Sequence, residues 1–126
     1  MIHLTRRGKV EPGSELFGRA FEPYIWMEII AHSSYSELLY PISYWGTASG
    51  FEVDFILGDH EIAIEVKAAE LAGAPHLKGL RGFKEEYTVR RSIVISMDLQ
   101  PRKTEDHIEI LPWQEFLTQL WGGKVI

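Results

Sequence analysis

Hydrophobic positions in the first part of the chain recur at the spacing of a helix. Ser14 is a favoured N-cap, and apolar residues continue from it at helical spacing to about Ala31. They cover nearly the whole circumference of the predicted helix, so we expect it to be covered on more than one side. Pro23 lies inside this helix and cannot donate a backbone hydrogen bond, which predicts a bend beside Glu22.

The middle of the chain has the two-residue period of β-strands. The stretch 42–47 is rich in aromatic residues and is followed by turn residues. In 51–57 the odd positions are apolar, and in 61–67 the even positions are apolar. Residues 58–60 join these two stretches, which are therefore predicted to form a β-hairpin.

The rest of the chain alternates between helix and strand. The predicted elements are a helix from about His76 to Tyr87, a strand at 92–96, a loop at 100–106, a strand at 107–111, and a helix that begins at Pro112 and ends before Gly122. This order of elements predicts an α/β fold, with a mixed β-sheet flanked by helices. There is no repeat or linker, so we expect 1–126 to be a single domain. Within it, 1–13 is an arm or the remnant of a longer N-terminal region.

Composition and charge restrict the classes of function. The chain has no cysteine, which excludes disulfides and thiolate-ligated metal sites. No stretch approaches the roughly 18 consecutive apolar residues of a membrane span, so we expect a cytoplasmic protein with no membrane partner. The formal net charge of -5 argues against a simple electrostatic grip on nucleic acid. Any contact with DNA must then be local or mediated by a metal ion.

The polar positions of the predicted hairpin form a candidate metal site. A symmetric hairpin centred between Asp59 and His60 places Asp54 opposite Glu65. By the same rule Glu52 lies opposite Lys67, and the four side chains share one face. Two directly opposed carboxylates repel by about 3–4 kcal/mol at an effective dielectric of 20. Full solvation, a shared proton or a hard cation such as Mg²⁺ would relieve this repulsion.

Lys67 gives this pattern two interpretations. Beside a cation held by the two carboxylates, it would orient water or stabilise negative charge on a phosphate. The same pattern is also typical of the outward polar face of an ordinary hairpin. There, Glu52 and Lys67 would form a surface salt bridge worth at most about 1 kcal/mol. The pattern alone leaves both interpretations open.

A resemblance to known families adds to this pattern. Asp54, followed after ten residues by Glu65-Val66-Lys67, is similar to the signature of the PD-(D/E)XK nucleases, whose core has a helix, this hairpin, and a further helix and strand. A wider series of motifs resembles the C-terminal domain of a family of prokaryotic AAA-type ATPases: Gly18-x-x-Phe21-Glu22, Tyr44-Trp45, Gly50-x-Glu52-Val53-Asp54-Phe55, Ile64-Glu65-Val66-Lys67, His76-Leu77-Lys78-Gly79-Leu80 and Leu111-Pro112-Trp113.

The resemblance implies a set of roles and two functions. It implies Mg²⁺ or Mn²⁺ bound by Asp54 and Glu65, a catalytic role for Lys67, and a supporting carboxylate at Glu22. The first implied function is metal-dependent cleavage of DNA. The second is a non-catalytic interaction domain with the nuclease fold, which docks on an AAA-type ATPase or forms a homo-oligomer. The chain has no glycine-rich phosphate loop, so it cannot hydrolyse ATP by that route.

The remaining candidates are less specific. The five histidines show no spacing typical of metal ligands. A basic stretch could contact phosphates or form a solvated helix face, and it consists of Lys78, Arg81, Lys84, Arg90 and Arg91. The four tryptophans are more typical of a core or an interface than of stacking platforms for bases.

Overall fold

The computed structural model of the protein describes residues 15–68 and 72–126, so the predicted arm at 1–13 lies outside the described residues. In chain order the elements are α1 (Glu15–Tyr35), β1 (Ile42–Gly46), β2 (Glu52–Leu57), β3 (Ile62–Val66), the 3₁₀ helix η1 (Ala74–Leu77), α2 (Lys78–Glu86), β4 (Arg91–Ser96), β5 (Arg102–Lys103), β6 (Ile108–Pro112) and α3 (Trp113–Trp121). Each helix and strand predicted from the sequence is present, with β5 and η1 in addition.

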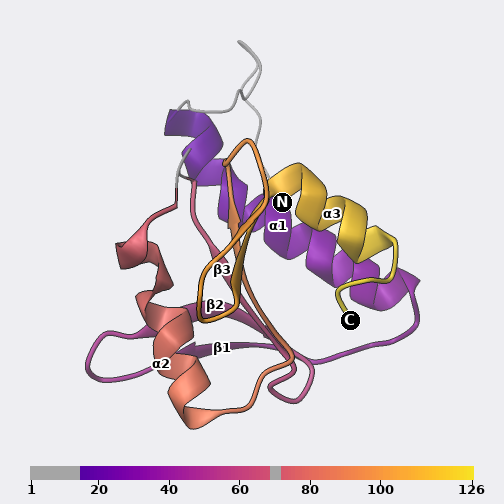
Figure 1. Cartoon of the computed structure of the whole chain (residues 1–126). Coiled ribbons are helices and arrows are strands. Elements are labelled where there is room, and N and C mark those ends of the chain that lie inside the picture. The colour runs from indigo at the N-terminus through magenta and orange to yellow at the C-terminus, as the bar shows by residue number, and fades with distance from the viewer. Residues whose placement is uncertain (1–14, 69–71) are drawn as a thin grey trace.

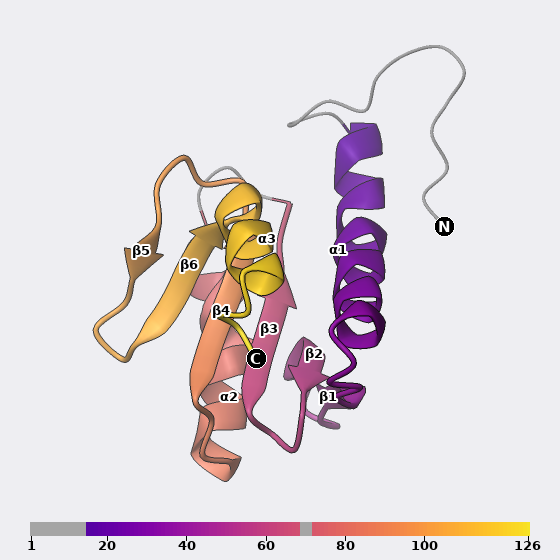
Figure 2. The same cartoon turned by 90° about the vertical axis from the view of Figure 1, so that its right-hand side faces the viewer.

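The strands form one mixed sheet in the order β1-β2-β3-β4-β6-β5. The neighbours β3, β4 and β6 are parallel, whereas β1, β2 and β5 each run antiparallel to their neighbours. Helices α1 and α3 cover one face and α2 covers the other (Figures 1 and 2). The predicted α/β architecture, a mixed sheet flanked by helices, is confirmed.

Helix α1 is longer than predicted. It continues through Pro23 as one helix and runs past Ala31 to Tyr35 (Figure 2). Its last turns are fixed by Tyr40, whose hydroxyl donates to the Ile29 carbonyl at 3.1 Å and contacts His32 Nδ1 at 2.9 Å. These contacts come from beyond the helix, so its own hydrophobic pattern did not reveal them. No helix among the described residues is long and apolar enough to cross a membrane.

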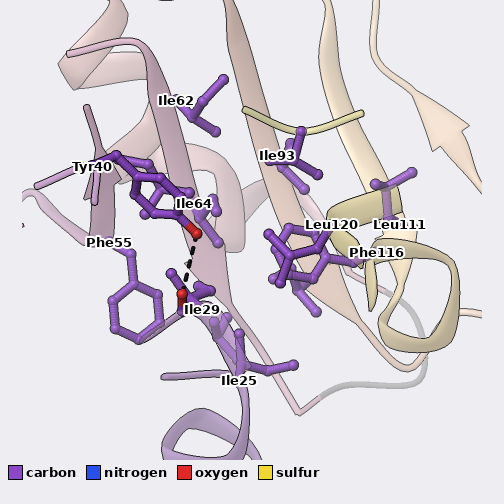
Figure 3. Packing of buried hydrophobic residues seen from close by; sticks show 14 of the residues in the cluster. Ile25, Ile29, Tyr40, Phe55, Ile62, Ile64, Ile93, Leu111, Phe116 and Leu120 are labelled. Atoms are coloured by element: carbon purple, nitrogen blue, oxygen red, sulfur yellow. Dashed lines mark hydrogen bonds between the residues drawn. The ribbon is translucent and has the colours of Figure 1, made fainter. Parts of the chain in front are cut away.

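Two hydrophobic cores lie on opposite faces of the sheet. The larger one joins α1 and α3 to the strands, and Figure 3 shows Ile25, Phe55, Ile64 and Phe116 meeting within it. The smaller one packs α2 against the other face. As a result all five residues of β3 are buried, including Glu65. The interpretation as an ordinary outward polar face is therefore wrong for Glu65, whereas Glu52 is exposed and Asp54 and Lys67 are partly buried.

Two boundaries near the C-terminus also differ from the prediction. The short strand β5 lies within the predicted 100–106 loop, where it pairs with β6. A strand of two residues is too short to show an alternating pattern. Pro112 ends β6 with extended backbone (φ -55°, ψ 143°) and is the N-cap of α3, so the helix begins at Trp113. Gly122 follows the helix as predicted, and its N–H donates to the Thr118 carbonyl at 3.0 Å.

Candidate functional site

Asp54 lies where the regular pairing of β2 ends. The β2–β3 pairs run from Leu57↔Ile62 to Phe55↔Ile64, which is the predicted register. Between β1 and β2 the register shifts around this point. Val53 packs in the smaller core against α2, whereas Phe55 packs in the larger core with α1 and α3. Residues two apart in a regular strand share one face, so the shift reverses the alternation at this point.

The Asp54 side chain replaces a strand partner at this irregularity. Its Oδ2 accepts a hydrogen bond from the Val66 N–H at 2.8 Å, beyond the last pair of the β2–β3 ladder. A backbone donor near the end of β3 is satisfied in this way, and one carboxylate oxygen is held in place. The hydrogen bond from Val66 engages Oδ2 alone, which leaves the partly buried Asp54 able to share further hydrogen bonds with Glu22 and Glu65.

Glu65 is the most constrained of the predicted site residues. Its side chain is only 5% exposed and shares a hydrogen bond with Asp54. Burial, followed by this hydrogen bond and the charge of Asp54, raises the pKa of Glu65 to about 9, while the charge of Lys67 acts in the opposite direction. A hydrogen bond between two carboxyl groups requires a proton, so the pair holds one at neutral pH. The raised pKa of Glu65 favours the shared proton among the three ways to relieve the repulsion.

Glu22 reaches the same place from α1. The pKa of Glu22 is raised first by partial burial, then by the charge of Asp54 and a hydrogen bond with that residue. Lys67 lowers it, as it does for Glu65. Glu22 therefore joins this cluster although Pro23 follows it in the helix. The structure brings together all four residues that the sequence singled out, namely Glu22, Asp54, Glu65 and Lys67.

Lys67 lies directly after β3 and is partly buried. Its backbone N–H donates to the Ile95 carbonyl at 2.9 Å, so the start of this segment is tied to β4. The ion pairs found among the described residues do not include one between Lys67 and Glu52. Its charge acts instead on the carboxyl groups of Glu22 and Glu65.

Tyr44, on the edge strand β1, belongs to this site but was missed by the sequence analysis. The pKa of its hydroxyl is raised by desolvation, then by a hydrogen bond with Glu52 and the nearby charges of Asp54 and Glu65. The available signal was the pairing of 42–47 with 51–57, which places Tyr44 beside the acidic end of the second strand. That pairing depends on the bulge, which the sequence does not show.

The site lies at the carboxyl ends of the parallel strands. Strands β3, β4 and β6 run in the same direction, and α1 lies beside β3 (Figure 2). Ligands of open α/β sheets bind outside this edge. Buried Asp98 fixes the chain nearby, because it accepts hydrogen bonds from the Ala72 N–H at 3.2 Å and from Arg102 Nη2 at 2.8 Å.

The donor set suits a hard cation with few protein ligands. No group of three or more His, Asp or Glu side chains within 15–68 and 72–126 is arranged to hold a metal ion. Mg²⁺ needs only one or two carboxylates and keeps several waters, which Asp54 and Glu65 satisfy. The described histidines are likewise outside any such group.

The basic stretch is engaged in contacts within the protein. Arg81 pairs with Asp106 at 2.8 Å, and Arg91 pairs with Glu109 at 2.7 Å. The Lys78 ammonium lies 4.8 Å from the centre of the Phe51 ring. These contacts favour a structural role for the stretch over a phosphate-binding surface.

The fold and the site together define an α/β domain with a cluster of carboxyl groups at the carboxyl edge of a mixed sheet. The chain belongs to the family described as Domain of unknown function (DUF4143), whose model matches residues 17–116. This range includes all four site residues. No curated protein and no solved structure matches the chain.

Proposed function

We propose that this domain is a Mg²⁺- or Mn²⁺-dependent phosphodiesterase that acts on DNA and has a PD-(D/E)XK-type core. The observation that carries the proposal is the buried carboxyl of Glu65 against Asp54, with Glu22 and Lys67 beside it. An acid buried next to another acid lowers stability, and the other four residues of β3 are apolar. Strongly perturbed pairs of this kind concentrate at catalytic and metal-binding sites.

Asp54 and Glu65 are the residues that would hold the cation. Both offer hard oxygen donors, and Asp54 is already oriented by the Val66 N–H. When bound, the cation would neutralise negative charge on a phosphodiester and polarise its P–O bonds. The shared proton must leave for both carboxylates to act as ligands.

Lys67 and Glu22 supply the remaining roles. The Lys67 ammonium stabilises negative charge that develops on the phosphate oxygens as the bond breaks. Its partial burial strengthens this interaction relative to bulk water. Glu22 has a raised pKa and accepts a proton more readily than an ordinary surface carboxylate, which suits it to hold and activate a water molecule.

The test compares Lys67→Ala with the wild type in Mn²⁺ titration and in plasmid cleavage. Loss of Lys67 should leave metal binding intact or slightly tighter, because a nearby positive charge repels the cation. Cleavage should fall by at least about 100-fold. Lys103→Ala is the matched control, since Lys103 is exposed on β5 at the opposite edge of the sheet. Undiminished cleavage by Lys67→Ala would overturn the role of Lys67. Absence of cleavage by the wild type across plasmid, linear and single-stranded DNA would contradict the proposed phosphodiesterase function.

An interaction domain is the second candidate, and a separate observation favours it. Helix α1 leaves Trp26, Met27 and Ile30 exposed at 40–42%, and Leu38 and Leu39 are exposed beyond its end. Apolar surface of this kind marks interfaces with other proteins. In this role the domain would dock on an AAA-type ATPase or on a second copy, and the carboxyl groups would have no catalytic part.

A further inference from the structure

The position of Tyr44 is not explained by burial. Its side chain is 62% exposed, so the ring gains little from the hydrophobic effect. The register of β1 nevertheless places Tyr44 opposite Asp54 and Phe55 at the bulge, and desolvation, followed by the charges of Glu52, Asp54 and Glu65, raises the pKa of its hydroxyl. An exposed aromatic ring thus lies at the rim of the carboxyl cluster.

Gly46 provides the space for this ring. A Cβ atom at residue 46 would lie 2.5 Å from the Tyr44 hydroxyl oxygen and 2.9–3.0 Å from two ring carbons. The end of the ring therefore occupies the volume that a side chain at 46 would need. Glycine inside a strand costs about 0.5–1 kcal/mol relative to alanine. Glycine therefore stands at the position that the end of the Tyr44 side chain covers.

A second aromatic residue borders the carboxyl groups from the helix side. Trp26 lies one helical turn after Glu22, so the two share a face of α1. Its ring stacks on Phe55, the neighbour of Asp54, with a centroid distance of 5.5 Å and an interplanar angle of 21°. Trp26 keeps 40% of its surface exposed despite this contact. Trp26 on α1 therefore contacts the residue next to Asp54, and Tyr44 on β1 lies opposite the same two residues.

The charge distribution limits how DNA could be held here. The chain carries a formal net charge of -5, and Arg81, Arg91 and Arg102 are paired with carboxylates. A duplex is gripped mainly through its phosphates, which needs available cations. A single strand carries phosphates as well, but its unpaired bases also stack on aromatic side chains, which needs no cation and contributes about 1–3 kcal/mol per base.

We propose that Tyr44 and Trp26 are stacking platforms for unpaired bases, and that the substrate of the site is single-stranded DNA or an unpaired segment of DNA. This inference rests on the proposed phosphodiesterase function. The two rings hold nucleotides on either side of the scissile phosphate, which then lies over Asp54 and Glu65. Gly46 acts as a positioning residue, because it leaves the Tyr44 ring its place.

The test measures binding of a labelled oligothymidine of about 12 nucleotides, and of the matching duplex, with Ca²⁺ in place of Mn²⁺. Tyr44→Ala and Trp26→Ala should each weaken binding of the single strand by about 5-fold or more. Tyr44→Phe should retain most of the affinity, whereas Gly46→Ala should lose it with Tyr44 unchanged. Tyr35→Ala is the matched control, since Tyr35 is 82% exposed at the other end of α1.

The possible results separate the two proposals. Binding of the single strand that depends on Tyr44, without any cleavage in Mn²⁺, would support base stacking at this site and contradict the phosphodiesterase function. Cleavage by the wild type, with unchanged affinity for the single strand in Tyr44→Ala and Gly46→Ala, would contradict base stacking on Tyr44. The proposed phosphodiesterase function would remain supported. Tighter binding of the duplex than of the single strand, or no binding of the single strand by the wild type, would also overturn the inference.

Discussion

Glu65 is the residue at which the requirements of folding and of chemistry differ most. The sequence identified it through its spacing to Asp54 and Lys67, and these residues do converge in the structure. Its burial could not be predicted, because a polar residue in an alternating strand is normally interpreted as facing water. Helix α2 covers that face of the sheet, and this packing depends on residues far along the chain.

Glu65→Gln should stabilise the protein, and the gain should grow with pH. The pKa of Glu65 is raised in the folded state, so the stability that its carboxyl contributes is present below about pH 4.3 and is lost as pH rises toward about 9. Glutamine keeps the shape and does not titrate. The gain in unfolding free energy should be larger at pH 9 than at pH 5 by about 1 kcal/mol or more. Urea unfolding at the two pH values measures it.

Glu105→Gln is the control for this measurement, since Glu105 is exposed in the loop before β6. It should show no pH-dependent difference from the wild type. An equal gain at both pH values for Glu65→Gln would contradict the raised pKa. Glu65→Gln should also bind Mn²⁺ at least about 10-fold more weakly than the wild type if Glu65 is a ligand.

At the level of elements, the alternating pattern predicted the strands well and their faces poorly. The register of the hairpin agrees with the prediction, because a short loop fixes it. The shift beside Asp54 arises from the pairing of β1 with β2, where one residue of β1, Tyr44, is matched by two of β2, Asp54 and Phe55. A bulge of this kind depends on tertiary contacts, so alternation within one strand does not reveal it.

The contact of α2 with β2 depends on Gly79. A Cβ atom at this position would lie 1.7 Å from the backbone oxygen of Glu52, which cannot move aside as a side chain can. We expect Gly79→Ala to lower the unfolding free energy by about 3 kcal/mol or more, even though alanine favours helix. Thermal or urea unfolding measures the change. Because Glu52 and Asp54 lie on β2, Mn²⁺ affinity should fall as well.

Gly82→Ala is the matched control on the same helix. A Cβ atom there would lie 3.4 Å from the Phe51 ring, which is ordinary contact. Alanine should then be neutral or stabilising by up to about 1 kcal/mol. Similar losses in both variants would show that general helix properties, rather than the close approach to Glu52, decide the outcome.

At the level of the whole molecule, the sequence predicted the layers but not which side chains remain exposed. The all-round apolar character of α1 predicted cover on more than one side, and the sheet and α3 supply one side. Trp26, Met27 and Ile30 remain on the surface. Whether such a surface is covered depends on other molecules, which a single chain does not encode in its own pattern.

If the apolar surface of α1 mediates self-association, the wild type should show a concentration-dependent increase in mass by light scattering. Ile30→Glu should abolish the increase, because a charge in the contact must lose its hydration without a partner. The fold should survive, since Ile30 is 40% exposed. Leu99→Glu is the control, because Leu99 is an isolated exposed residue after β4 and should leave the mass unchanged. Wild type that stays monomeric at all concentrations would exclude a second copy as the occupant of this surface. The interaction hypothesis would then require a different partner, such as an ATPase.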